Sequence, residues 1–516
     1  MALAKVTLSD VVFAALLLWL VGYTWAGGSP SLLHDASTGM HIRTGEFILD
    51  HRTVPRTDIF SFSRPGQPWF AWEWLADAGM AVLYRLAGLK AVVLAAAVCI
   101  ALAFWISVRH AVRLGANPLA AIAVLHVGVG ASSHHFLARP HALTLLFMAA
   151  GWWALDRDSG RPTRAVWLLV PLTALWVNLH GGFVAILISL VVFAAGSALE
   201  RRRQARRYVA LAAACGAASV LNPYGLRLFS HLNEYLRADW IRQWVEEFQP
   251  PRLGSPAGAY FELLLFAGLG TAALLAARGR HAHALLIAAW AHASLLSMRH
   301  IPIFFLIAGP MIAVELSAIW RHTVNQVSQT AAPALLWRIG ERFRPQFGRG
   351  GAAGVGLVAV LLLPGLDAFW PKDFPARRYP VELARRHAAR LAGTRLFTLD
   401  TWADFLIYEF YPRQKVFFDG RTDFYGQAIA EDYVRLVRGE SGWQELVRRY
   451  GFETALLPAD CPLTGLLMHL EGWKPEAKAA GAVLLVRPRA DSRASSAPGK
   501  SPSSGCGPLP ARSSSG

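Results

Sequence analysis

The sequence predicts an α-helical polytopic membrane protein with about eleven transmembrane helices, followed by a small α/β domain outside the membrane. Three observations lead to this fold class. Hydrophobic residues make up 54% of the 516 residues and charged residues only 16%, whereas roughly a quarter are charged in an ordinary soluble domain. Long apolar runs recur through the first 370 residues. Arginines cluster in alternate loops between these runs.

Eleven apolar runs are candidates for crossing a bilayer, because each approaches the roughly 20 residues that a spanning helix needs. In chain order they are 8–27, 89–108, 117–131, 140–155, 165–180, 183–199, 208–222, 259–277, 282–298, 301–319 and 352–370. We expect 8–27 to be retained as a span, since no convincing cleavage site for a signal peptide follows it. Some runs are short, and 140–155 covers only about 24 Å at ~1.5 Å per residue.

The net charge of +17 is interpreted here as a sign of topology. With the N-terminus in the cytoplasm, the arginine-rich loops all fall on the cytoplasmic side, as the positive-inside rule requires. Their arginines are Arg109, Arg113, Arg157, Arg161, Arg164, Arg201, Arg202, Arg203, Arg206, Arg207, Arg278, Arg280, Arg321, Arg338, Arg342, Arg344 and Arg349. This orientation places the chain after residue 370 outside the cytoplasm. Nucleic acid is therefore not an expected partner.

Two outer loops are too aromatic to be simple linkers. The first, 28–88, belongs to the membrane domain 1–370, and the second is 223–258. Each is expected to contain a helix lying at the membrane surface, because aromatic and charged residues alternate in it. The aromatic residues concerned are Trp69, Phe70, Trp72, Trp74 and Tyr84 in the first loop, and Trp240, Trp244 and Phe248 in the second.

Residues 371–490 lose the long apolar runs, and short strand-like and helix-like pieces alternate there, which is typical of an α/β domain. Strands are expected at 395–399, 415–418, 453–458 and 482–487, and helices near 401–410, 426–437, 443–450 and 463–471. The last residues, 491–516, are rich in Ser, Pro and Gly, so we expect a disordered tail.

Four polar motifs fall at the outer ends of separate spans. They contain His34, Asp35, His41, Glu46, Asp50 and Asp58; then His134, His135, Arg139, Pro140 and His141; then Trp176, Asn178, His180, Gly181 and Gly182; and finally Met298, Arg299, His300 and Pro302. Both Arg139 and Arg299 precede a proline that favours the first turn of a helix. An arginine beside a helix N-terminus is a good phosphate site. The alternative is that each arginine reaches lipid headgroups.

The first outer loop also offers a general base for an acceptor hydroxyl. Asp35 is the first candidate, followed by Asp58 and Glu46; the alternative for each is an ordinary solvated loop acid. The histidines of the other motifs suggest a divalent metal, yet no pair has the spacing of a known metal-binding helix. Interfacial histidines are therefore the favoured interpretation, and no metal ligand is assigned.

Taken together, these residues resemble the GT-C superfamily of integral-membrane glycosyltransferases. More narrowly, the chain is similar to bacterial membrane proteins of the RgtA/B/C/D-like and dolichyl-phosphate-mannose mannosyltransferase-like group. The residues that carry the resemblance are Asp35, His41, Thr44, Gly45, Glu46, Thr57, Asp58, Phe60, Ser61, Trp72, Glu73, Trp74, Leu75, Trp176, Asn178, His180, Gly181, Asn222, Pro223, Tyr224, Gly225, Arg299, His300, Pro302, Phe418, Asp419, Gly420, Arg421, Asp423, Tyr425 and Gly426.

The resemblance implies an enzyme that takes a sugar from a polyprenyl-phosphate carrier and inverts the anomeric centre, on the outer side of a bacterial inner membrane. Asp35 would be the base. Many relatives carry a second acid two residues later, where this chain has Ser37, and this departure argues against a metal-assisted reaction. The expected substrate residues are His41, Glu73, Arg139, His141, Asn178, His180, Arg299 and His300.

The acceptor would be a glycan, a lipid or a protein of the cell envelope. Asp419, Arg421 and Asp423 are expected to help hold it, although the same residues also fit a simple turn after a strand. Two other functions stay open at this point. One is a transporter or flippase for an anionic, lipid-linked substrate, and the other is a non-catalytic membrane assembly protein.

Overall fold

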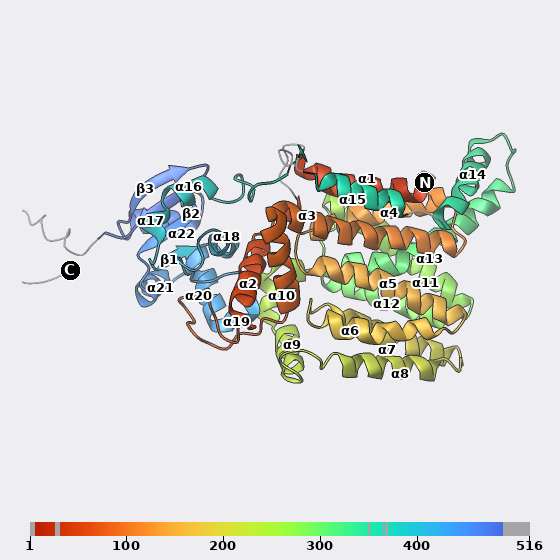
Figure 1. Cartoon of the computed structure of the whole chain (residues 1–516), viewed down its shortest axis with the longest axis horizontal. Helices are drawn as coiled ribbons and strands as arrows, with labels where there is room; N and C mark the ends of the chain where they lie inside the picture. The colour runs from red at the N-terminus through yellow and green to blue at the C-terminus, as the bar shows by residue number, and fades with distance from the viewer. Residues whose placement is uncertain (1–5, 26–30, 349–350, 364, 367–369, 489–516) are drawn as a thin grey trace, which may run out of the picture.

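The structure is a computed structural model that describes residues 6–25, 31–348, 351–363, 365–366 and 370–488. Long helices lie side by side in a bundle, and the C-terminal residues are gathered beyond one end of it (Figure 1). The expected disordered tail, 491–516, lies outside the described residues.

Each of the eleven apolar runs contains helix. The bundle helices are α1 (Leu8–Trp25), α3 (Trp74–Arg113), α4 (Pro118–Ser132), α5 (His141–Gly160), α6 (Leu169–Trp176), α7 (Phe183–Leu199), α8 (Ala205–Ala218), α11 (Pro256–Ala277), α12 (His281–Leu296), α13 (Ile301–Val324) and α15 (Ala352–Leu361). Within the described residues, three helical segments are long and apolar enough to cross a membrane: Trp74–Arg113, Pro256–Ala277 and Met298–Val324. The chain is thus a multi-pass membrane protein, and the number of eleven spans stays a prediction.

Local sequence explains where several bundle helices begin. The side chain of Asn117 accepts a hydrogen bond from the Leu119 N–H, and Ser255 does the same for Gly258, so both cap the free N–H groups of a helix start. A proline stands in the first turn of α4, α11 and α13, as expected for a residue without an N–H. The surface helix predicted around Trp74 continues into a span as α3, with a kink at Gly88, where φ is +63°.

Shorter helices occupy the two ends of the bundle. Beside the C-terminal part lie α2 (Ser37–His51), α9 (Arg227–Arg237) and α10 (Asp239–Trp244), with single turns at Ser31–Leu33, Ser133–His135, Glu246–Phe248 and Met298–His300. At the other end lies α14 (Ala332–Phe343) (Figure 1), and two further turns are Arg164–Leu168 and Arg344–Gly348. Figure 1 shows α2, α9 and α10 between the bundle and the C-terminal part.

The C-terminal part contains a four-stranded sheet in the order β1-β2-β4-β3. Its strands are β1 (Leu396–Thr398), β2 (Thr454–Pro458), β3 (Lys474–Ala479) and β4 (Ala482–Val486). β1 is parallel to β2, and β4 is antiparallel to both β2 and β3. The helices are α16 (Val381–Arg386), α17 (Ala388–Leu391), α18 (Asp400–Phe410), α19 (Thr422–Tyr425), α20 (Gln427–Arg438), α21 (Trp443–Tyr450) and α22 (Pro462–His469).

One predicted strand of this part was wrong, and one strand was missed. Residues 415–418 form only isolated bridges, in which Val416 pairs with Ser61 of the first loop and with Leu396. β3 was missed because it is polar and largely exposed, so it lacks the apolar alternation by which a half-buried strand is recognised. The backbone of Val416 exchanges hydrogen bonds with Phe60 and Phe62, which joins the first loop to the edge of the sheet.

Candidate functional site

A cavity of about 420 Å³ opens where the bundle meets α2, α9, α10 and the C-terminal part. The bundle helices α5, α7, α12 and α13 contribute apolar side chains to its lining, among them Leu145, Val184, Ile188, Leu296 and Ile303. The rest of the wall is rich in charged and aromatic side chains. A cavity that is apolar toward the bundle and polar toward the loops suits an amphipathic ligand.

Two arginines in the cavity face one carboxylate. Arg139 lies two residues before α5, Arg299 lies two residues before α13, and Glu247 belongs to the turn that follows α10. The Glu247 oxygens lie 3.7 Å from Arg139 Nη1 and 4.0 Å from Arg299 Nη1. Burial alone would raise the pKa of Glu247, but Arg299 and Arg139 outweigh it and hold the pKa below its usual value. The two guanidinium groups thus form a site for an anion.

Asp35, the first candidate for the base, holds one of these arginines. Its Oδ2 accepts a hydrogen bond from Arg139 Nη1 at 2.7 Å, and its Oδ1 accepts the Ser37 N–H at 2.8 Å. Burial would raise the pKa of Asp35, yet Arg139 and the Ser37 N–H lower it further than burial raises it. Among the described residues, Ser37 and Arg139 line the cavity while Asp35 lies behind them.

Glu73 projects into the cavity from the residue before α3, between two histidines. Its Oε2 lies 3.6 Å from His41 Nε2, and its Oε1 lies 3.4 Å from His180 Nε2. His41, on α2, also contacts Asp77 through Nδ1 at 2.7 Å. Burial raises the pKa of Glu73 to about 7, with Asp77 adding to the rise and His41 opposing it.

Close packing explains why the motif at His180 has a glycine at position 182. A Cβ on Gly182 would lie 2.4 Å from Thr144 Oγ1 and 2.7 Å from His180 Nδ1, so only glycine fits there. The Gly182 N–H donates to His180 Nδ1, and Trp176 Nε1 donates to Thr144 Oγ1. Thr144 Oγ1 in turn lies 2.8 Å from His180 Nδ1, so these contacts fix the imidazole with its other nitrogen toward Glu73.

Three further histidines of the motifs bind backbone carbonyl groups. His134 contacts the Met298 carbonyl, His141 the His135 carbonyl and His300 the Ala293 carbonyl, each through a ring nitrogen. In the part of the chain that the structure describes, no group of three or more His, Cys, Asp or Glu side chains is arranged to hold a metal ion. Because Asp35 is occupied by Arg139 and Ser37, its surroundings do not fit a metal site either.

Solved structures with a similar fold include those of two GT-C membrane glycosyltransferases, ArnT and an oligosaccharyltransferase. ArnT from Cupriavidus metallidurans matches with a TM-score of 0.53 in the apo state, at 15% identity over 92% of this chain and 97% of ArnT. ArnT bound to undecaprenyl phosphate matches with 0.51, at 13% identity over 93% and 98%. The Archaeoglobus fulgidus oligosaccharyltransferase tethered with an acceptor peptide matches with 0.56, at 10% identity over 88% and 69%. The chain has the GT-C fold. No protein-family model and no curated protein matches its sequence.

Three residues that were candidates from the sequence, Glu46, Asp58 and Asn178, do not line the cavity in this GT-C fold. Asp58 is fully buried and accepts from the Phe60 and Ser61 N–H groups. Glu46 pairs with Arg43 one turn earlier on α2. Asn178 joins α3 to the bundle, because its Oδ1 accepts from Trp74 Nε1 while its Nδ2 donates to the Ala174 and Leu221 carbonyls.

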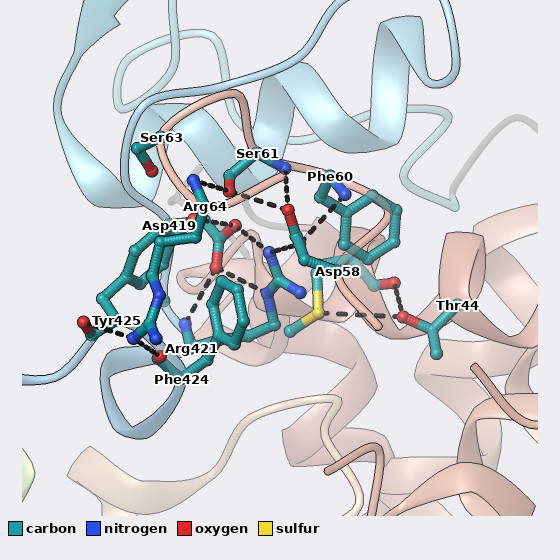
Figure 2. Close-up of polar contacts among 12 residues, drawn as sticks. Thr44, Asp58, Phe60, Ser61, Ser63, Arg64, Asp419, Arg421, Phe424 and Tyr425 are labelled. Atoms are coloured by element: carbon teal, nitrogen blue, oxygen red, sulfur yellow. Dashed lines mark hydrogen bonds and ion pairs between the residues drawn. The ribbon is translucent and has the colours of Figure 1, made fainter. Parts of the chain in front are cut away.

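Of the three C-terminal candidates, Asp419 and Arg421 form a buried ion pair, and Arg421 and Asp423 line the cavity. Arg421 donates to Asp419 and, at 2.8 Å, to Asp58 of the first loop, and all three side chains are buried (Figure 2). Tyr425 donates to Asp419 from the other side. Arg421 and Asp423 line the cavity, and Asp423 also contacts His231 of α9 at 3.0 Å. The C-terminal part therefore closes one side of the cavity in this GT-C fold.

Sequence reasoning missed two acids that the structure brings to the site. Glu247 was overlooked although it directly precedes Phe248, one of the aromatic residues expected at the membrane surface. Asp77 stands four residues after Glu73, a spacing that places two side chains on one face of a helix. That spacing was the available sign that Glu73 and Asp77 act on a common neighbour.

Proposed function

We propose that the chain is an inverting glycosyltransferase that moves a sugar from a polyprenyl-phosphate carrier to an acceptor hydroxyl on the outer side of a bacterial inner membrane. The observation that carries this proposal is the pair Arg139 and Arg299, which face one carboxylate at 3.7 and 4.0 Å. Glu247 occupies the place that the carrier phosphate would take. The GT-C fold supports the same conclusion.

The shape of the cavity fits the two ends of such a donor. The apolar wall on α7 and α12 would contact the polyprenyl chain, and Ile188 and Leu296 are exposed there. The phosphate would lie between the arginines, each of which can donate two hydrogen bonds to it. Arg299 is held by the ring of Phe248, which lies 4.3 Å from its guanidinium carbon.

The proposed reaction is a single displacement. The acceptor oxygen forms a bond to the anomeric carbon of the sugar, and the bond from that carbon to the phosphate oxygen breaks with its electron pair. A carboxylate takes the proton of the acceptor hydroxyl. Arg139 and Arg299 stabilise the charge that develops on the leaving phosphate. Asp35 keeps Arg139 in place through its ion pair.

The C-terminal part would bind the acceptor, which is a glycan, a lipid or a protein. Arg421 and Asp423 reach the cavity from this part, and Trp72 and Tyr235 face it from the loops. Aromatic side chains next to hydrogen-bonding groups are a common surface for sugar rings and other amphipathic groups. Asp419 acts through Arg421, to which it is bound.

Binding of undecaprenyl phosphate to the full-length protein in nanodiscs tests the proposal. Arg139→Ala and Arg299→Ala should each weaken binding by about tenfold or more, since a charge-assisted hydrogen bond contributes ~1.5–3 kcal/mol. Arg237→Ala is the matched control, because this arginine is exposed on α9 and lies outside the cavity wall. Equal binding by all three variants would contradict the proposal.

Product analysis separates transfer from transport. Incubation with polyprenyl-phosphate sugars and an extract of the cell envelope should release polyprenyl phosphate and yield a new glycoside. Movement of the intact lipid across the nanodisc or vesicle membrane without a new glycoside would instead identify a flippase. Binding with neither result would point to a non-catalytic role.

A further inference from the structure

Glu73 differs from the other acids of the cavity in its contacts. Asp77 is hydrogen-bonded to His41, Asp423 contacts His231, and Glu247 faces two arginines. The oxygens of Glu73 face histidine nitrogens at 3.4 and 3.6 Å, which is longer than a normal hydrogen bond. This carboxylate has 15% of its side chain exposed, toward the cavity that it lines.

The protonation of His180 follows from its backbone contact. The Gly182 N–H is a fixed donor and lies 2.8 Å from His180 Nδ1, so this nitrogen is the acceptor. The proton of the neutral ring is then on Nε2, which faces Glu73. Burial and the neighbouring histidines and arginines hold the pKa of His180 well below its usual value. His180 therefore directs an N–H at Glu73 without adding a charge.

His41 connects Glu73 to a second carboxylate. Its Nδ1 donates to Asp77 Oδ1 at 2.7 Å, and its Nε2 faces Glu73 Oε2. Burial would lower the pKa of His41, but Asp77 and Glu73 outweigh it and raise the pKa above its usual value. A carboxylate behind an imidazole fixes its tautomer and orientation. His41 thus directs an N–H at Glu73 and is itself held in place by Asp77.

Glu73 and the anion site face the same small space. A hollow of about 10 Å³ beside the main cavity is lined by Glu73, Arg139, His180, Glu247 and Arg299, among others. The carboxylate that would accept the proton and the arginines that would hold the leaving phosphate therefore lie at one site.

We propose that Glu73 is the catalytic base and that His41, Asp77 and His180 are the residues that position it. Glu73 takes the proton of the acceptor hydroxyl as the acceptor oxygen attacks the sugar, and the electron pair of the broken bond leaves with the phosphate. Glu73 then gives the proton to solvent or to the released phosphate through the cavity that it lines. This inference rests on the proposed function, and it gives Asp35 the separate task of holding Arg139.

The ionisation of Glu73 agrees with this role. Burial raises its pKa to about 7, close to the pH at which a general base works best. The charged groups that face it come from several elements: His41 on α2, Asp77 on α3, Arg139 before α5 and Asp423 of the C-terminal part. The nearby acids raise the pKa of Glu73 and the nearby cations lower it. Because these effects oppose each other, burial sets the direction of the shift.

The test compares Glu73→Gln and Asp35→Asn in the full-length protein in nanodiscs. Two quantities are measured for each: binding of undecaprenyl phosphate, and release of polyprenyl phosphate from a panel of polyprenyl-phosphate sugars with an envelope extract as acceptor. Glu73→Gln should bind undecaprenyl phosphate like the wild type and release product about 100-fold or more slowly. Asp35→Asn should weaken binding, because Arg139 loses its partner. Glu234→Gln, an exposed acid on α9, is the control.

One further variant guards against a purely structural effect. Glu73→Asp should keep part of the rate, with a changed dependence on pH, because the carboxylate is retained at a new position. Release by Glu73→Gln within about tenfold of the wild-type rate would overturn the assignment of the base and leave the proposed function standing. Loss of release in Asp35→Asn with unchanged lipid binding would overturn it as well. Absence of release by the wild type with every donor would overturn the proposed function and the base with it.

Discussion

Gly45 of α2 lies against Asp77 of α3 so closely that a Cβ on Gly45 would be 1.9 Å from the Asp77 carbonyl oxygen. No side chain fits in that space. The close approach of the two helices brings His41, one turn before Gly45, to 2.7 Å from the Asp77 carboxylate. A single glycine therefore sets the distance on which the position of Glu73 depends.

Gly45→Ala should push α2 and α3 apart and break the contact between His41 and Asp77. We expect the rate of sugar transfer to fall by about tenfold or more, since an overpacked contact costs ~1–3 kcal/mol and displaces its neighbours. Thermal unfolding of the purified protein should also begin at a lower temperature. Gly79→Ala is the control, because a Cβ there meets nothing within 4 Å. A fully active Gly45→Ala variant would contradict this account.

Glu247 stands where the donor phosphate is expected, so it competes with the phosphate for the two arginines. Glu247→Gln should bind undecaprenyl phosphate more tightly, by about tenfold, which corresponds to ~1.4 kcal/mol. A binding assay in nanodiscs measures the change. Glu246→Gln removes an exposed charge next to it and should have little effect. Weaker binding by Glu247→Gln would show instead that this carboxylate positions the arginines.

The sequence predicted the parts of the site that lie within single motifs. Arg139, His180 and Arg299 were expected on the outer side because each stands at the outer end of an apolar run, and the structure brings all three to one cavity. Glu247 depends on how the loop after α9 folds back over the bundle. The contact of His41 with Asp77 depends on the packing of two helices at Gly45. Periodicity within one segment contains neither kind of information.

Asp58 shows that the fold also depends on contacts between distant segments, which local sequence patterns do not reveal. As a loop acid it was a candidate base, yet its partner Arg421 follows 363 residues later in the chain. The prediction of helical runs and of an α/β part needed only local composition. The attachment of that part to the first loop, through Arg421 and Val416, arises from contacts between distant segments.

Arg421→Met should loosen the C-terminal part from the first loop. It would leave Asp58 and Asp419 buried without their cation, and removing one partner of a buried ion pair costs ~3–5 kcal/mol. We expect a lower temperature of unfolding and faster proteolysis of the first loop. Adding Asp58→Asn should recover part of the loss, since one of the unpaired charges is gone. Arg438→Met changes an exposed arginine and serves as the control; equal stability of both variants would count against a structural role for Arg421.

His41→Gln should move the acidic limb of the pH–rate profile to higher pH. A general base works only when it is ionised, so the rate rises with pH as Glu73, with a pKa of about 7, loses its proton. The positive charge of His41 lowers the pKa of Glu73, and its removal raises that pKa. At neutral pH a smaller fraction of Glu73 is then ionised and the rate falls, while the rate at high pH recovers in part. His51→Gln, on the exposed end of α2, should keep the wild-type profile. An acidic limb that stays in place or moves to lower pH in His41→Gln would mean that another group takes the proton.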